Sequence, residues 1–311
     1  MSIGDELGAF AVRGDTALTI GVFDGVHRGH THLISQLIGE AASKGLLAGV
    51  VTFREHPAAV LSPSFQAQYL TSFEDRLDLL GQTKIDLAVP ITFDRALASL
   101  AAGEFISLLQ ENLRMVSLVV GPDFAMGRKR EGTIERLTEL GEEMGFTLKV
   151  VDGLKDDKGH AVRSTTVRSA LAKGDVERVA HLLGRRFTLE GPVVSGKGRG
   201  GSLGIPTANI APPSEMATPG DGIYAAYAHL DDRKLKAAVS IGTNPTFGGL
   251  DRTIEPFILD FDGNLYGSTL RLEFVRRLRD QVKFDSVEAL LEQIDRDVAQ
   301  TRQILENATP C

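Results

Sequence analysis

The sequence is poor in cysteine and tryptophan: its 311 residues include one cysteine, Cys311, and no tryptophan. One cysteine cannot form a disulfide within the chain, which excludes a disulfide-stabilised scaffold and suits a reducing compartment, so we expect a cytoplasmic protein. No run of about 18 apolar residues is present, so no transmembrane helix is expected. The first 16 residues also lack the apolar region of a signal peptide.

An excess of basic residues is missing as well. Lys and Arg total 34, Asp and Glu total 41, and the formal charge is −7. A general nucleic-acid binder is usually basic, so we expect no nucleic-acid partner, although a local site for a small anion remains open. With 42% hydrophobic and 24% charged residues, the composition is typical of a globular protein. The length fits about two domains.

Strand-like and helix-like segments alternate in the first half of the chain. The expected strands are 17–21, 47–53, 87–91, 117–121 and 146–151. The expected helices are 30–43, 73–81, 104–113, 133–144, 166–173 and 176–183. This order predicts a doubly wound, Rossmann-like parallel sheet with helices on both faces.

The pattern changes near residue 185. Short strand-like segments with Gly and Pro turns follow, at 187–194, 222–228, 236–241, 252–261 and 269–274, and an amphipathic helix is expected at 286–305. Such spacing predicts a small antiparallel β-barrel with a terminal helix. We therefore predict two domains, residues 1–185 and 186–311.

The segment Gly-Val-Phe-Asp-Gly-Val-His-Arg-Gly-His, residues 21–30, follows an expected strand and opens an expected helix. Ligands of open α/β sheets bind beyond the carboxyl ends of the strands, and helix N-termini attract anions. His27 and His30 could therefore donate to one phosphate chain. Taken alone, two histidines at this spacing also fit a polar helix cap. A metal site is disfavoured because, apart from His32, no further ligand of suitable spacing lies nearby.

This ten-residue run resembles the bacterial bifunctional riboflavin kinase/FMN adenylyltransferase (FAD synthetase) family, and His-x-Gly-His resembles the wider nucleotidyltransferase superfamily. The resemblance implies that His27 and His30 steady the α-phosphate region during adenylyl transfer. It also implies an ATP contact for four residues of the same loop: Gly21, Phe23, Asp24 and Gly25.

Two further segments of the first half resemble the same family. Residues 52–57, Thr-Phe-Arg-Glu-His-Pro, resemble its Thr-Phe-(Asp/Glu)-Pro-His-Pro turn but depart from it at Arg54 and Glu55. Residues 121–132 resemble its Gly-x-(Asp/Asn)-Phe-x-Phe-Gly loop, with Met replacing the second aromatic residue. The resemblance implies that His56 and Asp123 contact the flavin or the nucleotide.

Residues 163–168, Arg-Ser-Thr-Thr-Val-Arg, resemble the family's Ser-Ser-Thr-x-(Ile/Val)-Arg signature, with Arg163 where Ser is more usual. Ser164 and Thr165 lie where a loop meets an expected helix, and their hydroxyl and N–H groups can donate to phosphate. Arg168 can form a bidentate contact to the leaving pyrophosphate. In isolation, Ser-Thr-Thr would be an ordinary helix N-cap.

A glycine-rich basic segment opens the second half: residues 196–209 read Gly-Lys-Gly-Arg-Gly-Gly-Ser-Leu-Gly-Ile-Pro-Thr-Ala-Asn. Its backbone N–H groups could wrap a polyphosphate, although it is not a Walker A loop and composition alone also fits a flexible loop. The Gly-x-Pro-Thr-Ala-Asn part resembles the riboflavin kinase signature, with Gly201 where Arg is usual. The resemblance implies ATP contacts from Gly196, Lys197, Arg199, Gly204 and Thr207. The hydroxyl of Thr207 and the amide carbonyl of Asn209 are hard oxygen ligands suited to Mg²⁺.

Thr253-Ile-Glu255 resembles the part of riboflavin kinases that carries the catalytic base. The chemistry needs a carboxylate beside the ribityl 5′-hydroxyl to accept its proton. Without these flanking residues, a lone Glu on a strand would be read as solvated surface.

Together the motifs imply a bifunctional enzyme. Its C-terminal domain would phosphorylate riboflavin with ATP and Mg²⁺, and its N-terminal domain would transfer AMP from ATP to FMN, giving FAD and pyrophosphate. We expect small-molecule partners and a monomer or weak homo-oligomer. Two alternatives remain: a nucleotidyltransferase with another phosphorylated acceptor, and a flavin-binding regulator that lacks one activity.

Overall fold

The computed structural model describes residues 2–195, 207–243 and 252–309. It divides into two compact units, Met1–Arg163 and Ser164–Cys311. The second unit thus includes two helices that precede residue 185, α8 (Ser164–Ala172) and α9 (Val176–Leu183). The predicted domain boundary near residue 185 stays a prediction.

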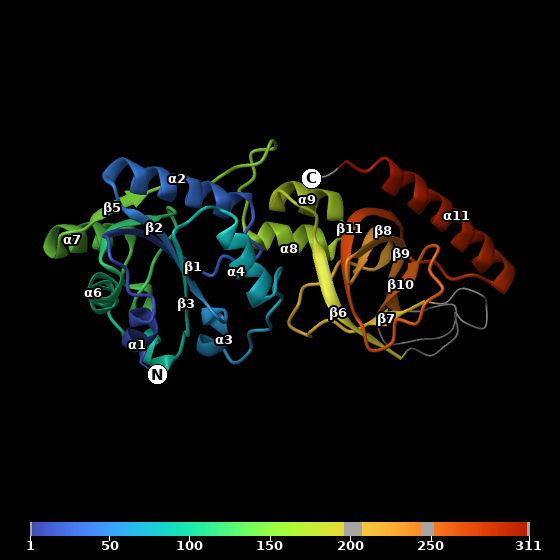
Figure 1. Cartoon of the computed structure of the whole chain (residues 1–311), viewed down its shortest axis with the longest axis horizontal. Helices are drawn as coiled ribbons and strands as arrows, with labels where there is room; N and C mark the ends of the chain where they lie inside the picture. The colour runs from blue at the N-terminus through green and yellow to red at the C-terminus, as the bar shows by residue number, and fades with distance from the viewer. Residues whose placement is uncertain (1, 196–206, 244–251, 310–311) are drawn as a thin grey trace. The chain divides into compact units, whose positions relative to one another are not determined.

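The first unit is built on a five-stranded parallel sheet (Figure 1). The strands are β1 (Thr16–Gly21), β2 (Leu47–Phe53), β3 (Leu87–Ile91), β4 (Met115–Val120) and β5 (Thr147–Val150), in the order β3-β2-β1-β4-β5. Strands such as β1 and β4 are buried along nearly their whole length, as apolar strands covered on both faces must be.

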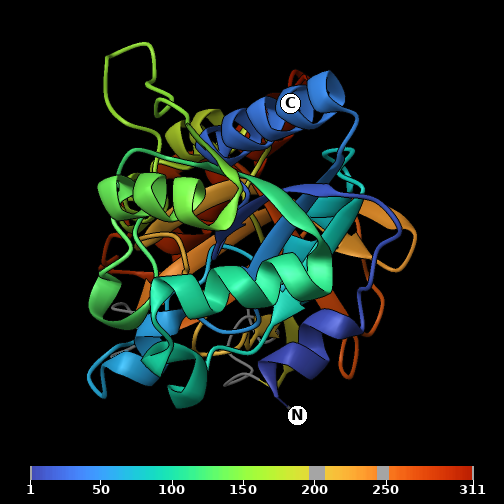
Figure 2. The same cartoon turned by 90° about the vertical axis from the view of Figure 1, so that its left-hand side faces the viewer.

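Helices cover both faces of this sheet, which confirms the predicted doubly wound architecture. The helices of the unit are α1 (Ile3–Gly8), α2 (Arg28–Lys44), α3 (Pro57–Leu61), α4 (Phe73–Gly81), α5 (Arg95–Ser99), α6 (Ala102–Leu113) and α7 (Ile134–Met144). One apolar cluster joins α1, α6 and α7 to the sheet, and a second joins α2 and α4 to its opposite face. Figure 2 shows α2 in blue above the sheet and α6 in teal below it.

The strand order reverses between β1 and β4. The chain runs outward from β1 through β2 and β3, then returns to place β4 on the other side of β1. The loops after β1 and β4 therefore leave the same edge in opposite directions, and open α/β sheets bind ligands in the crevice that this divergence creates. The motif loop 21–30 and the loop that begins at Gly121 flank this crevice.

The second unit is a nearly closed antiparallel barrel, as predicted. Its strands are β6 (Thr188–Val194), β7 (Asn209–Ile210), β8 (Gly222–Leu230), β9 (Arg233–Thr243), β10 (Arg252–Ile258) and β11 (Thr269–Arg279), in the order β10-β9-β8-β11-β6-β7. The edge strands meet where the Ala208 N–H donates to the carbonyl of Pro256 over 3.0 Å. The expected terminal helix, α11 (Val287–Glu306), packs on β8, β9 and β11.

Alternating side chains fill the barrel. In β6 the buried positions are Leu189, Gly191 and Val193, so every second residue faces inward. The Tyr224 ring meets Phe274 edge-on, with the centroids 5.6 Å apart, and both side chains are fully buried. The barrel interior is therefore a packed core, and a ligand must bind on its rim or its outer surface.

The sequence does not predict the short helices α1, α3 and α5. Each has five or six residues, too few to show a helical hydrophobic period. Strands β9 and β11 extend beyond their predicted ends. The prediction stopped short because many of the added residues are charged and at least partly exposed, so they continue no hydrophobic pattern. A hydrophobic pattern identifies the buried part of a strand better than its exposed end.

Leu109→Ala tests the packing of the first unit. Leu109 lies on α6 and is fully buried in the cluster that joins this helix to the sheet. We expect the substitution to lower the free energy of unfolding by about 2–5 kcal/mol, because it leaves a cavity. Leu61→Ala, at a side chain that is 64% exposed, is the control and should change it by less than about 0.5 kcal/mol. Urea unfolding followed by circular dichroism measures both, and equal effects would contradict the assigned packing.

Candidate functional site

The first turn of α2 holds the two motif histidines against each other. His27 is the N-cap residue, and its Nδ1 accepts a hydrogen bond from the His30 N–H over 3.2 Å. Because Nδ1 accepts, the proton of the neutral ring is on Nε2, which is the donor this ring offers. The two rings stack with centroids 3.6 Å apart. The two predicted histidines therefore form one stacked pair at the N-terminus of α2.

Gly29 permits a close approach at this turn. A Cβ at this position would lie 2.5 Å from the carbonyl oxygen of Val162 and 3.1 Å from the His27 ring. Real Cβ atoms do not approach a backbone oxygen so closely, so any side chain here would push residue 162 or the first turn of α2 aside. The glycine between the histidines is thus a packing requirement that sequence reasoning did not use.

His30 is neutral in this environment. Burial lowers the pKa of His30 well below its usual value of 6.5, and a charge on the neighbouring His27 would lower it further. The ring is partly exposed overall, but its Nδ1 is buried and has no hydrogen-bond partner among the described residues. A buried nitrogen without a partner is costly, so a polar group beyond the described residues would stabilise His30.

The loop between β1 and α2 has an unusual backbone. Phe23 and Val26 adopt φ values of 53° and 34°, and Gly25 between them has φ 79°. A positive φ is strained for a bulky or β-branched residue and is retained where surrounding contacts enforce it. Both apolar side chains are buried, and the Phe23 ring lies 5.0 Å from the His30 ring. Core packing thus holds the strained loop against the histidines.

Asp24 anchors this loop from within the protein. The side chain is 2% exposed, and its carboxylate accepts hydrogen bonds from the backbone N–H groups of Leu70 and Thr71, at 2.9 and 3.4 Å. The Gly25 N–H in turn donates to the Thr71 hydroxyl over 3.2 Å. These contacts fix the Asp24 carboxylate against residues 70 and 71, and its contact with ATP stays a prediction. Gly21 is the last residue of β1, and the loop begins after it.

Arg76 is a site residue that the sequence reasoning missed. This α4 side chain is 2% exposed and donates to the carbonyl oxygens of Val22, Phe53 and Arg54, at 2.8, 2.8 and 3.0 Å. Burial lowers the pKa of Arg76, and the negative charge of Asp24 opposes that effect. Its guanidinium therefore joins the ends of β1 and β2. The sequence carries no signal for this role, because the burial of Arg76 is visible only in the structure.

The 52–57 turn is held by aromatic contacts. The His56 Nδ1 caps α3 by accepting from the Ala58 N–H over 3.1 Å, and its ring stacks on Phe65 with centroids 4.9 Å apart. The Arg54 guanidinium lies 5.3 Å from the centre of the Phe73 ring, as does that of Arg76. Arg54 thus stabilises the turn through a cation–π contact, at a position where the family resemblance predicts an acid. Glu55 is exposed.

Asp123, in the loop after β4, accepts a 2.5 Å hydrogen bond from the Arg163 guanidinium. Ser164, Thr165 and Arg168 follow on α8, whose first residue is Ser164. By the division into compact units, these three residues belong to the second unit and the histidine pair to the first. Their assignment to the leaving pyrophosphate stays a prediction.

Glu255 lies on the outer face of the barrel. In β10 the residues Ile254 and Pro256 are buried, while Glu255 is half-exposed and accepts a 2.8 Å hydrogen bond from the Thr253 hydroxyl. Ser240 of β9 stands directly opposite Glu255, and its hydroxyl accepts from the Gln281 amide over 3.0 Å. A carboxylate in this partly solvated position can take a proton from a substrate hydroxyl.

Thr207 and Asn209 lie beside this strand. The residue between them, Ala208, is buried and bonds through its N–H to the carbonyl of Pro256, the residue after Glu255. Side chains two apart on an extended segment share a face, so the Thr207 and Asn209 oxygens lie on the side away from Ala208. One hydroxyl and one amide carbonyl fit Mg²⁺ that arrives with a nucleotide and keeps several waters. Gly196, Lys197, Arg199, Gly201 and Gly204 lie outside the described residues.

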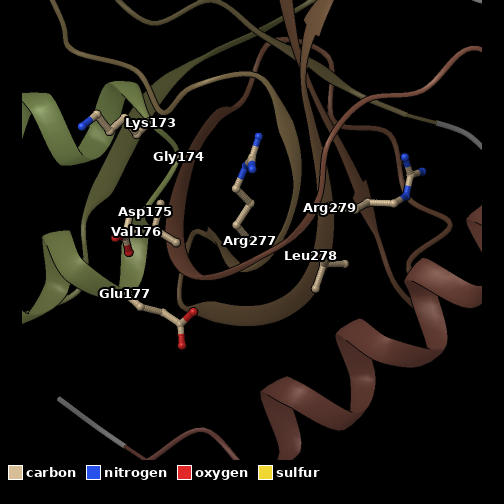
Figure 3. A pocket seen from close by; sticks show the side chains of 8 residues that line it. All are labelled: Lys173, Gly174, Asp175, Val176, Glu177, Arg277, Leu278 and Arg279. Carbon is tan, nitrogen blue, oxygen red and sulfur yellow. The ribbon is translucent and has the colours of Figure 1, made fainter.

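The second unit also holds a cavity of about 310 Å³, shown in Figure 3. It is lined by Lys173, Gly174, Asp175, Val176, Glu177, Arg277, Leu278 and Arg279. None of the predicted site residues lines it. Several of its charges are matched by protein groups: Arg279 binds Asp297 over 2.6 Å, and Glu177 binds Arg276 over 2.9 Å. We assign it no substrate.

Comparison with known proteins identifies the two halves separately. The family model described as FAD synthetase matches residues 10–166, which include the histidine pair. The model described as riboflavin kinase matches residues 183–305, which include Thr207, Asn209 and Glu255. Each model therefore covers one of the two sites built above.

Whole-length relatives combine both halves in one chain. A bifunctional riboflavin kinase/FMN adenylyltransferase of Escherichia coli is 35% identical over 295 residues, covering 94% of each chain. The protein of the same description from Bacillus subtilis is 31% identical over 297 residues, covering 94% of this chain and 93% of that one. Fold and sites thus define a two-domain nucleotide-dependent transferase. The chain belongs to the bifunctional riboflavin kinase/FMN adenylyltransferase family.

A solved structure from Streptococcus pneumoniae, described as a macrolide-efflux protein, has the same fold. Its TM-score is 0.85 at 30% identity, and the match covers 96% of each chain. Among the described residues of the present chain, no helix has the length and apolar character needed to cross a membrane. We use this likeness for the fold alone.

Gly29→Ala tests the close approach at α2. The added methyl would meet the Val162 carbonyl, so we expect the rate of adenylyl transfer to FMN to fall at least about tenfold, since small displacements of catalytic groups are costly. Gly39→Ala on the same helix is the control, because nothing lies within 4 Å of a Cβ there and alanine favours helix. Measuring the rate of FAD formation with both variants tests this expectation. Equal activity in the two variants would contradict the packing argument.

The charge state of His30 gives a second test. Because its pKa is lower in the folded protein than in the unfolded chain, its contribution to stability is complete above about pH 6.5 and is lost as the pH falls toward the folded value. Imidazole nitrogen chemical shifts, assigned with His30→Gln, should show a neutral ring at pH 6.5. A ring half-protonated at that pH would contradict the assigned environment.

Proposed function

We propose that this chain makes FAD from riboflavin in two ATP-dependent steps, one in each half. The observation that carries the proposal is the presence, in one polypeptide, of an imidazole pair at a helix N-terminus and a carboxylate beside Thr207 and Asn209. The two family-model matches and the whole-length relatives support both activities.

The first half performs adenylyl transfer. An oxygen of the FMN phosphate attacks the α-phosphorus of ATP, the α–β bond breaks, and FAD and pyrophosphate leave. This transfer needs no covalent enzyme intermediate, so catalysis rests on positioning and on neutralising phosphate charge. The Nε2–H of His27, the neutral His30 and the N-terminus of α2 offer donors to the α-phosphate region. The loop of Gly21, Phe23 and Gly25 approaches the nucleotide.

Three further contacts follow from the motifs. His56 contacts the flavin or the nucleotide from the 52–57 turn, where Phe65 supports its ring. Ser164 and Thr165 donate to the leaving pyrophosphate, and Arg168 binds it through two parallel hydrogen bonds. These roles rest on the resemblance of the motifs to those of the family.

The second half performs phosphoryl transfer. Glu255 accepts the proton of the riboflavin 5′-hydroxyl as that oxygen attacks the γ-phosphorus of ATP, and ADP leaves. The hydrogen bond from Thr253 orients the carboxylate. Thr207 and Asn209 would hold Mg²⁺, which when bound neutralises phosphate charge. Gly196, Lys197, Arg199 and Gly204 would contact ATP, as their resemblance to the family motif implies.

The proposal extends to the location, oligomeric state and partners of the enzyme. We propose a cytoplasmic location, a monomer or weak homo-oligomer, and small-molecule partners without nucleic acid. The single cysteine and the net charge of −7 support these expectations.

Separate substitutions should separate the two activities. Glu255→Ala should lower the rate of FMN formation by about 10²–10⁴-fold through loss of the general base, and leave the conversion of FMN to FAD unchanged. His30→Ala should lower the rate of FMN-to-FAD conversion and leave FMN formation unchanged, because it removes one ring of the imidazole pair. Chromatographic separation of riboflavin, FMN and FAD after incubation with ATP and Mg²⁺ measures both rates.

His32→Ala, on the same helix but outside the stacked pair, is the matched control for His30. Loss of both activities in either folded variant would show that the two sites are not separate. If the unmodified protein forms FMN but no FAD, the first half acts on a different phosphorylated acceptor or has lost its activity.

A further inference from the structure

Arg163 lies between β5 and α8, and the functional assignments above give it no part in the reaction. We propose that Arg163 contacts a substrate phosphate during adenylyl transfer, with Asp123 as the residue that positions it. The inference rests on the proposed function of the first half and names a further phosphate ligand within that site.

The backbone places Arg163 next to the histidine pair. The carbonyl oxygen of the preceding residue, Val162, lies so close to Gly29 that a Cβ there would be 2.5 Å away. Residue 162 is itself held, because its N–H donates to the carbonyl of Leu154 over 2.9 Å. Arg163 thus follows a fixed backbone position against the first turn of α2.

The side chain of Arg163 is held by the loop that follows β4. The Arg163 Nη2 donates to the Asp123 Oδ2 over 2.5 Å, and Asp123 lies in the loop that follows β4. In the same loop, the Arg130 guanidinium donates to the backbone carbonyl of Asp123 over 3.3 Å. The ion pair therefore joins the loop after β4 to the segment after β5, whose Val162 carbonyl lies against the first turn of α2. These segments follow the carboxyl ends of the strands, where α/β sheets bind ligands.

Exposure and chemistry point to a ligand role for this pair. The side chains of Arg163 and Asp123 are 61% and 72% exposed, and an exposed ion pair contributes little to folding. A guanidinium has five N–H donors in a planar fork, and one carboxylate oxygen occupies few of them. The remaining donors can bind phosphate oxygens while Asp123 keeps the fork in place. In a chain of net charge −7, a local cation favours the approach of a polyanion.

Two substrates carry the phosphate chemistry that this guanidinium fits: the polyphosphate of ATP and the monophosphate of FMN. Steady-state kinetics of FAD formation, with each substrate varied in turn, distinguishes them. Arg163→Gln removes the charge at similar length, and we expect the KM for the contacted substrate to rise about 3- to 10-fold. Arg163→Lys keeps the charge without the planar fork. Its KM should therefore lie between those of the unmodified chain and of Arg163→Gln.

The chain offers a matched control. Arg114 and Asp15 form another exposed ion pair, with 54% and 46% side-chain exposure and a 2.7 Å contact, at the amino ends of β4 and β1. Arg114→Gln therefore removes an equivalent pair from the opposite edge of the same sheet and should leave both KM values unchanged. Circular dichroism and urea unfolding of every variant, measured in parallel, report whether the first unit is folded.

A higher KM for ATP alone identifies the nucleotide as the partner of Arg163, and a higher KM for FMN alone identifies the acceptor. Unchanged KM and kcat in Arg163→Gln, with FAD formation intact in the unmodified chain, would overturn the inference and leave the proposed function standing. Absence of FAD formation by the unmodified chain would instead refute the proposed function.

The role of Asp123 is tested by a double-mutant cycle. If Asp123 acts by positioning Arg163, Asp123→Ala raises the same KM, and adding it to Arg163→Gln causes no further rise. Independent, additive effects would show that Asp123 contacts the substrate on its own and would overturn its positioning role.

Discussion

The candidate site of the first unit depends on the buried guanidinium of Arg76. Parallel strands end in carbonyl groups that need donors, and here one side chain supplies them for residues 22, 53 and 54. Asp24 provides the opposite charge and fixes the backbone of residues 70 and 71. The strained loop before α2 is therefore supported on two sides by charged groups, and this support holds the stacked histidines in position.

The sequence was sufficient for the architecture and for the main motifs. Hydrophobic periods of two and 3.6 residues predicted the long elements, and the run from Gly21 to His30 predicted the site at the end of β1. Arg76 escaped because a single arginine within an amphipathic helix has no pattern of its own. The low pKa of His30 also required the structure, since burial of one ring nitrogen depends on residues distant in the chain.

The motifs show where one-dimensional resemblance reaches its limit. Asp24 matches a nucleotide-binding motif, yet its carboxylate is occupied with backbone N–H groups inside the protein. At Arg54, where the family resemblance predicts an acid, the guanidinium packs over Phe73 instead. A motif position therefore reports that a residue matters, whereas the contacts decide whether it acts by binding substrate or by shaping the backbone.

Pro256 has a consequence for the motions of the barrel. It lies in the edge strand β10, has no N–H to donate, and accepts from Ala208 at the junction with the two-residue strand β7. Among the described residues, the Ala208–Pro256 hydrogen bond joins these two edges of the barrel. The amides at this junction are therefore less protected from exchange than those of the long β8–β9 and β8–β11 ladders. Amide hydrogen exchange should therefore be faster along this junction than in the two ladders, so that the barrel opens locally beside Glu255 before it unfolds globally.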